Sequence, residues 1–205
     1  VHILNNPNPF GTSENDYFGK AVAISGDYAI VGAGYEDDAD GEYSGKAYIY
    51  NVTTGALVHI LDNPNPFGTS QYDGFGGSVA ISDDYAIVGA YSEDDADGAQ
   101  TSSGKAYIYN VTTGVLVHTL DNPNPDGINT NDTFGYSVAI SGGRAIVSAK
   151  NEYDADGTDS GKAYIYNVTS GLLVHTLDNP NPVDTSQNDW FGNSVAISGD
   201  YAIVS

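Results

Sequence analysis

Apolar and polar residues alternate in short runs along this chain, and each run ends at Gly, Asn or Asp residues that favour turns. In the first stretch, Ala21–Ser25 and Tyr28–Gly32 are separated by a Gly-Asp turn and predict a tight hairpin. Lys46–Asn51 follows, with Ala and Ile alternating with Tyr, and Ala56–Leu61 comes after a Val-Thr-Thr-Gly turn. No helical period of about 3.6 residues competes with this alternation. The pattern therefore predicts four short β-strands in succession.

The four-strand unit repeats every 57 to 59 residues, as the Phe-Gly pairs that open successive copies show. Those pairs begin at Phe18, Phe75, Phe134 and Phe191. Four antiparallel strands in a unit of roughly 40–50 residues are typical of a β-propeller blade, whereas a β-helix has shorter repeats. We therefore expect an all-β propeller with blades at 18–61, 75–120 and 134–177. Residues 1–4 would form strand four of a preceding blade, and residues 191–205 the first two strands of a following one.

About three and a half blades leave sheet edges open, which proteins rarely tolerate. We therefore interpret the 205 residues as part of a longer repeat protein, or as a segment that another copy of itself completes.

The copies resemble the FG-GAP repeat of the seven-bladed propellers found in integrin α subunits and in many bacterial surface proteins. The resemblance rests on Phe-Gly and Gly-Ala pairs, at Phe18-Gly19, Gly32-Ala33, Phe75-Gly76 and Gly89-Ala90. It implies a ring of seven blades, about twice the length of this chain, with strand one of each blade near the axis. The sequence departs from the family pattern at the Pro of the motif, which is replaced by Gly34, Tyr91 and Lys150. It also has only a tight turn between strands one and two, where integrin-type repeats place a calcium loop.

Acidic residues concentrate instead between strands two and three, where a Glu-x-Asp-x-Asp-Gly pattern occurs three times. Carboxylates at alternate positions followed by Gly can curl around one hard cation, and carboxylate oxygens are ligands that Ca²⁺ prefers. The candidate metal ligands are Glu36, Asp38 and Asp40, then Glu93, Asp95 and Asp97, then Glu152, Asp154 and Asp156. The intervening position drifts to Tyr153 in the third copy, whereas the candidate positions stay acidic. The alternative is a solvated acidic turn that recurs only because the unit was duplicated.

The chain has six basic and 27 acidic residues, a formal net charge of −21. In a four-stranded meander, 23 of the 27 acidic residues fall at the end that carries the two–three loops, where bound cations would relieve their repulsion. This charge argues against nucleic acid and anionic lipid as partners. No stretch approaches the ~18–20 apolar residues of a membrane helix, so we expect no membrane insertion in this segment. The absence of Cys excludes a disulfide framework and thiolate metal sites.

Several repeated residues have structural interpretations. The four His occupy one strand-four position, one in each copy, and are expected to be ordinary outer-strand residues. Asn-Val-Thr at Asn51, Asn110 and Asn167 matches a glycosylation acceptor, but turn chemistry explains these residues as well. Strand-three tyrosines such as Tyr48 and Tyr50 are expected to pack between blades, with stacking on sugars as the alternative.

An active site needs unlike groups that converge once, whereas nearly every polar residue here recurs in each unit. The residues that do not recur, such as Lys20, Arg144, Lys150 and Trp190, form no recognisable constellation, and we expect partner specificity to lie with them. We therefore expect a non-enzymatic, calcium-stabilised adhesion or interaction propeller at a cell or virion surface. Its partner would be a protein, a glycan or further copies of itself. A structural subunit of a surface fibre or virion is the first alternative, and a carbohydrate-binding propeller is the second.

Overall fold

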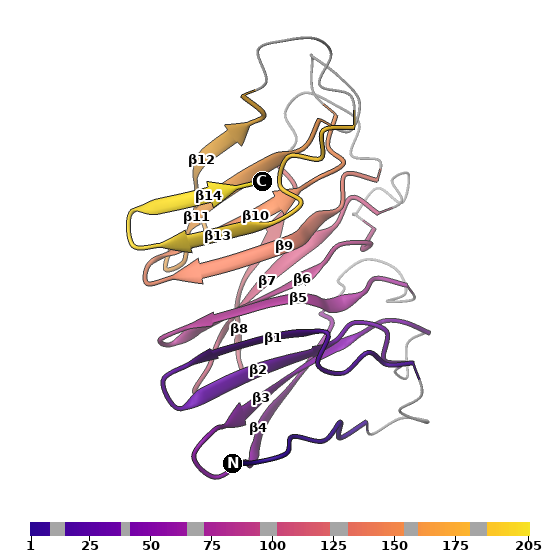
Figure 1. Cartoon of the computed structure of the whole chain (residues 1–205), viewed down its shortest axis with the longest axis vertical. Coiled ribbons are helices and arrows are strands. Elements are labelled where there is room, and N and C mark those ends of the chain that lie inside the picture. Colours follow the sequence, from indigo (N-terminus) through magenta and orange to yellow (C-terminus); the bar gives the residue numbers. More distant parts are fainter. Residues whose placement is uncertain are drawn as a thin grey trace.

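The computed structural model describes residues 1–8, 15–37, 42–64, 72–94, 102–123, 131–153, 160–180 and 188–205. Within these ranges all regular secondary structure is β, arranged as three four-stranded sheets and one two-stranded sheet (Figure 1). The first sheet comprises β1 Ala21–Ser25, β2 Tyr28–Ala33, β3 Lys46–Asn51 and β4 Leu57–Asp62. The second comprises β5 Phe75–Ser82, β6 Tyr85–Ala90, β7 Lys105–Asn110 and β8 Leu116–Asp121. The third comprises β9 Phe134–Ser141, β10 Arg144–Ala149, β11 Lys162–Asn167 and β12 Leu173–Asp178, and the fourth β13 Val195–Ser198 and β14 Tyr201–Val204.

Each four-stranded sheet is a meander whose strands pair antiparallel in chain order, as in β1-β2-β3-β4. The sheets stack face to face from the N-terminal to the C-terminal end (Figure 1). Their first strands, β1, β5, β9 and β13, pack on one another in succession, as expected for strands near the axis of a propeller. The second strands therefore end, and the first strands begin, at the same end of the stack. We call this the loop end.

The prediction of an all-β chain built of four-stranded antiparallel blades is confirmed. In the first sheet the predicted strands agree with the observed ones within one residue at each end. Val1–Leu4 differs from the expectation of a strand, because the structure gives these residues no regular secondary structure. His2 nevertheless lies where the repeat register places it, with Nε2 3.0 Å from the carbonyl oxygen of Thr53.

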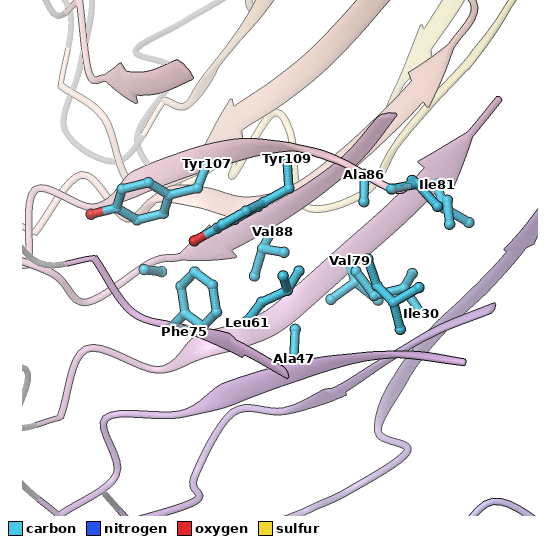
Figure 2. Close-up of a cluster of buried hydrophobic side chains, with 13 residues drawn as sticks. Ile30, Ala47, Leu61, Phe75, Val79, Ile81, Ala86, Val88, Tyr107 and Tyr109 are labelled. Carbon is cyan, nitrogen blue, oxygen red and sulfur yellow. The ribbon is translucent and has the colours of Figure 1, made fainter. Parts of the chain in front are cut away.

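The hydrophobic core lies between the sheets, because the middle strands are covered on both faces, by neighbouring blades or, in the first sheet, by Leu4 and Phe18. The third strands, β3, β7 and β11, accordingly bury five consecutive residues each. One such layer is shown in Figure 2 and contains Ile30, Ala47 and Leu61 from the first sheet and Phe75, Val79, Val88, Tyr107 and Tyr109 from the second. The Phe75 ring centroid lies 5.7 Å from that of Tyr107 and 6.2 Å from that of Tyr109. Strand-three tyrosines therefore pack between blades, as predicted.

The Phe-Gly pair joins each blade to the preceding one through its backbone. The Phe75 amide donates a hydrogen bond of 3.0 Å to the Ser44 carbonyl, across the boundary between the first two sheets. Gly76 has φ +87°, and a Cβ atom on it would lie 2.2 Å from the carbonyl oxygen of Lys46. A Cβ atom on Gly32 would lie 2.0 Å from the carbonyl oxygen of Gly76. The two motif glycines are therefore required by one close approach of two backbones.

The repeated His and Asn residues have the structural roles predicted for them. His59 Nε2 lies 3.0 Å from the carbonyl oxygen of Thr112, so the outer strand of one blade contacts the outer hairpin of the next. Asn51 Oδ1 accepts hydrogen bonds from the amides of Thr53 and Thr54 and thereby closes the hairpin between β3 and β4. Nothing helical in the described ranges is long and apolar enough to cross a membrane.

Candidate metal centre

The first predicted ligand of each acidic loop is fixed by a backbone turn at the end of the second strand. The amide of Glu36 donates to the carbonyl of Ala33, the last residue of β2, at 3.1 Å. The carbonyl of Glu36 in turn accepts a 2.9 Å hydrogen bond from the amide of Gly45, just before β3. Glu93 and Glu152 have the same backbone bonds after β6 and β10. The turn directs each glutamate side chain into the protein instead of into solvent.

These three glutamates are fully buried, with 0% exposure each. Strand three supplies one partner, because the hydroxyl of Tyr48 donates to Glu36 Oε1 at 2.5 Å. Tyr107 and Tyr164 donate in the same way to Glu93 and Glu152, both at 2.6 Å. The second carboxylate oxygen, Oε2, has no hydrogen-bond partner within the described part of the chain in any of the three copies. Each site therefore presents a buried oxygen that lacks the partner a buried charge requires.

A second carboxylate lies near each glutamate and comes from the linker that precedes the blade. Asp16, Asp73 and Asp132 are 3%, 3% and 0% exposed, respectively. The amide groups of Asn6, Asn63 and Asn122 donate to the Oδ2 atoms of these aspartates at 2.8 Å. The Asn-Pro linker is thereby tied back on itself over ten residues, so that two acidic side chains enter each blade at the loop end.

Burial raises the pKa of Glu36 to about 7, and raises the pKa values of Glu93 and Glu152 to about 8. The tyrosine hydrogen bond lowers these pKa values, and the neighbouring linker aspartate raises them again. A buried lysine at the start of strand three also favours the ionised glutamate. In the third blade its Nζ atom, on Lys162, lies 3.8 Å from Glu152 Oε1.

The remaining predicted ligands, Asp38, Asp40, Asp95, Asp97, Asp154 and Asp156, lie outside the described residues. The described portions alone bring no three acidic or histidine side chains together in a metal-binding group. What they show is one buried carboxylate oxygen without a partner at the start of each acidic loop. Hard oxygen donors of this kind suit Ca²⁺, so the residues present fit the predicted ion.

Sequence reasoning missed that the first predicted ligand of each loop is buried and that a linker aspartate lies beside it. The recurrence of Asp16, Asp73 and Asp132 two residues before each Phe-Gly pair was the available signal. It also missed where the non-repeated residues gather. Lys20 lines a cavity at the loop end together with three tyrosines, and Lys150 lies over the ring of one of them.

The sequence profile described as FG-GAP repeat matches residues 10–50, 68–109, 125–166 and 181–205. A search of curated proteins found no match. Among solved structures, the WD40 repeats of RRP9 are similar with a TM-score of 0.55 and 13% identity, over 91% of this chain and 44% of that one. U3-55K is similar with a TM-score of 0.55 and 12% identity, over 91% of this chain and 45% of that one. At these identities the similarity shows the propeller fold alone, and this chain spans less than half the length of either protein.

Proposed function

Because the chain belongs to the FG-GAP repeat family, we propose that it is a non-catalytic, calcium-stabilised interaction or adhesion propeller that acts outside the cell. The family match establishes propeller repeats of the integrin-like type. Repeats of this kind usually present their loops to other macromolecules.

The calcium part rests on the buried glutamate that opens each acidic loop. When Glu36 is ionised, its Oε2 atom is a buried carboxylate oxygen without a hydrogen bond in the described part of the chain, and such an oxygen is expensive to leave unsatisfied. A cation held by Glu36, Asp38 and Asp40 would supply that partner and offset the negative charge of the loop. Glu93 and Glu152 would open equivalent sites with the aspartates that follow them. Mg²⁺ is less suitable, because it demands a tight octahedron and gives up water reluctantly.

The location follows from the affinity expected for this ligand set. Three carboxylates without a bidentate glutamate at a twelfth position favour a dissociation constant of about 10⁻⁴–10⁻³ M, as in extracellular modules. Such sites fill at the millimolar calcium concentrations found outside cells and stay empty in cytosol. This supports a place on a cell or virion surface.

The non-catalytic part is supported by the repetition of the buried ionisable groups. Glu93 lies near Asp73 just as Glu36 lies near Asp16. Groups that recur unchanged in successive blades have a structural role in each blade, whereas an active site brings different groups together once.

The test is thermal unfolding of the full chain with millimolar Ca²⁺ and with a chelator. We expect Ca²⁺ to stabilise the fold by roughly 0.4–1.4 kcal/mol per site at about 1 mM, over the affinity range given above. The combined variant Asp38→Asn, Asp95→Asn and Asp154→Asn should lose most of this shift. The matched control Asp27→Asn, Asp84→Asn and Asp200→Asn removes the same charge from the opposite end of the blades and should keep it. Unfolding that ignores Ca²⁺ in the parent chain would refute the calcium part.

A further inference from the structure

The loop end contains a cavity of about 380 Å³ that spans three successive blades. This volume lies within the range of small-molecule sites, roughly 300–1,000 Å³. The cavity sits where the second strands end and the first strands begin. Its lining includes Lys20, Gly34, Tyr35, Gly77, Tyr91 and Tyr136.

These lining residues come from positions at which the otherwise similar units differ. The residue after Phe-Gly is Lys20, Gly77, Tyr136 and Asn193 in the four units. The residue after the Gly-Ala or Ser-Ala pair is Gly34, Tyr91 and Lys150. The strands beside them carry nearly the same residues in every blade, such as the Lys-Ala-Tyr-Ile-Tyr-Asn of strand three. One cavity therefore brings together several of the side chains that differ between units, and ligand specificity requires such non-repeated residues.

The aromatic rings of the cavity are held by one another and by glycine. The hydroxyl oxygens of Tyr35 and Tyr91 lie 3.1 Å apart, within hydrogen-bond distance, although the two residues belong to different blades. The rings of Tyr91 and Tyr136 meet edge to face, with centroids 5.9 Å apart. A Cβ atom on Gly77 would lie 2.7 Å from the Tyr91 ring, so the ring takes this position only because Gly77 has no side chain. All three tyrosines remain partly exposed.

Charge around the cavity selects against cationic and polyanionic ligands. Lys20 Nζ lies 5.4 Å from the centroid of Tyr35, and Lys150 Nζ lies 3.8 Å from that of Tyr136. Each ammonium group lies over one face of its tyrosine ring and would repel a cationic ligand. A polyanion is repelled by the net charge of −21 and by the acidic residues at the loop end. A neutral polar ligand with an apolar face is compatible with both.

We propose that this cavity binds a neutral glycan through one pyranose ring. The C–H face of a pyranose stacks on an aromatic ring, and its hydroxyls find partners in the tyrosine hydroxyls, the Lys20 ammonium and the backbone beside Gly34 and Gly77. The inference rests on the interaction function proposed above and names its site and ligand class. Of the proposed metal ligands, the three in the described part of the chain, Glu36, Glu93 and Glu152, do not line the cavity.

The test is a glycan array carrying neutral, sialylated and sulfated glycans, probed with the labelled full chain in the presence of millimolar Ca²⁺. We expect binding to neutral glycans. The free form of the best neutral glycan is then titrated against variants by intrinsic tyrosine and tryptophan fluorescence. Tyr91→Ala and Tyr136→Ala should each weaken binding roughly three- to tenfold, the range expected for the loss of one stacked ring. Tyr91→Phe, which keeps the ring, should lose less.

Tyr153→Ala is the matched control, because Tyr153 is a half-exposed tyrosine at the loop end that does not line the cavity. It should bind like the parent chain, and melting curves identify any variant that fails to fold. No binding on the array, preference for sialylated or sulfated glycans, or equal losses in Tyr153→Ala and Tyr136→Ala would each overturn the inference. If calcium still stabilises the chain and the array stays negative, the glycan site fails while the calcium proposal stands.

Discussion

The phenol of Tyr107 donates a 2.6 Å hydrogen bond to Oε1 of Glu93, a carboxylate with no exposed surface. The tyrosine lies within β7 and the glutamate lies three residues beyond the end of β6, so the bond ties the start of the acidic loop to the sheet. Equivalent bonds join Tyr48 to Glu36 and Tyr164 to Glu152. The first carboxylate of each loop is therefore held in place by its own blade.

The buried glutamates predict that the metal-free chain is less stable at alkaline than at mildly acidic pH. Burial raises the pKa of Glu36 to about 7, and those of Glu93 and Glu152 to about 8, above the unfolded value of 4.5. Below the unfolded pKa both the folded and the unfolded chain hold these protons, so the free energy of unfolding does not change with pH through these groups. As the pH rises to the folded pKa, the unfolded chain ionises while the folded chain keeps its protons. Over this pH interval each of the three glutamates lowers the free energy of unfolding, with a combined loss on the order of several kcal/mol.

This prediction is checked by unfolding the chain in chelator between about pH 5 and pH 9. Stability should fall with rising pH and level off above about pH 8, where the folded state also ionises. The control is the triple variant Glu36→Gln, Glu93→Gln and Glu152→Gln, which keeps the side-chain size and should show a much smaller fall. Equal falls in the parent and the triple variant would assign the effect to general charge repulsion instead.

Removal of the Tyr107 hydroxyl should destabilise the second blade. Tyr107→Phe keeps the ring that packs on Phe75 but leaves Glu93 without its donor. We expect a loss of about 1–3 kcal/mol in the free energy of unfolding, the usual effect of an unsatisfied buried group. The pKa of Glu93 should also rise further, because the tyrosine bond lowers it. Urea unfolding measures the first effect.

Tyr109→Phe is the natural comparison for Tyr107→Phe. The hydroxyl of Tyr109 donates only a long bond of 3.3 Å, to the carbonyl of Asp62, so its loss should be smaller. Comparable losses of stability in the two variants would mean that the Tyr107–Glu93 hydrogen bond stabilises the fold no more than the long Tyr109 bond does.

Most of the fold could be predicted from the sequence because the evidence for it is local. Alternation in runs such as Lys46–Asn51 and the turn residues between runs are set by a few neighbouring residues, and the strands follow within one residue. The repeat then supplies the long-range information, since one blade predicts the others. The burial of Glu93 and its closeness to Asp73, a linker residue twenty positions earlier, are different, because they arise from the folding of the linker and of the loop, which no local pattern predicts.

The aromatic cavity shows the other limit of sequence reasoning. Lys20, Tyr91 and Tyr136 are separated by tens of residues and lie at repeat positions whose residue type changes from unit to unit. They meet because blade stacking places the starts of first strands beside the end of a second strand at the loop end. Only the comparison of the units, position by position, marks them as the residues that differ.

The close backbone approach between blades predicts a steep loss of stability for Gly104→Ala. Gly104 has φ +83°, and a Cβ atom there would lie 2.1 Å from the carbonyl oxygen of Phe134 in the next blade. Both the left-handed conformation and the clash oppose the methyl group, so we expect a loss of about 3 kcal/mol or more. Gly142→Ala separates the two effects, because Gly142 also has positive φ, +53°, but nothing lies within 4 Å of its Cβ position. That variant should lose only the conformational part, about 1 kcal/mol. Thermal unfolding of both variants measures the difference, and equal losses would show that the Phe-Gly contact between blades is looser than 2.1 Å implies.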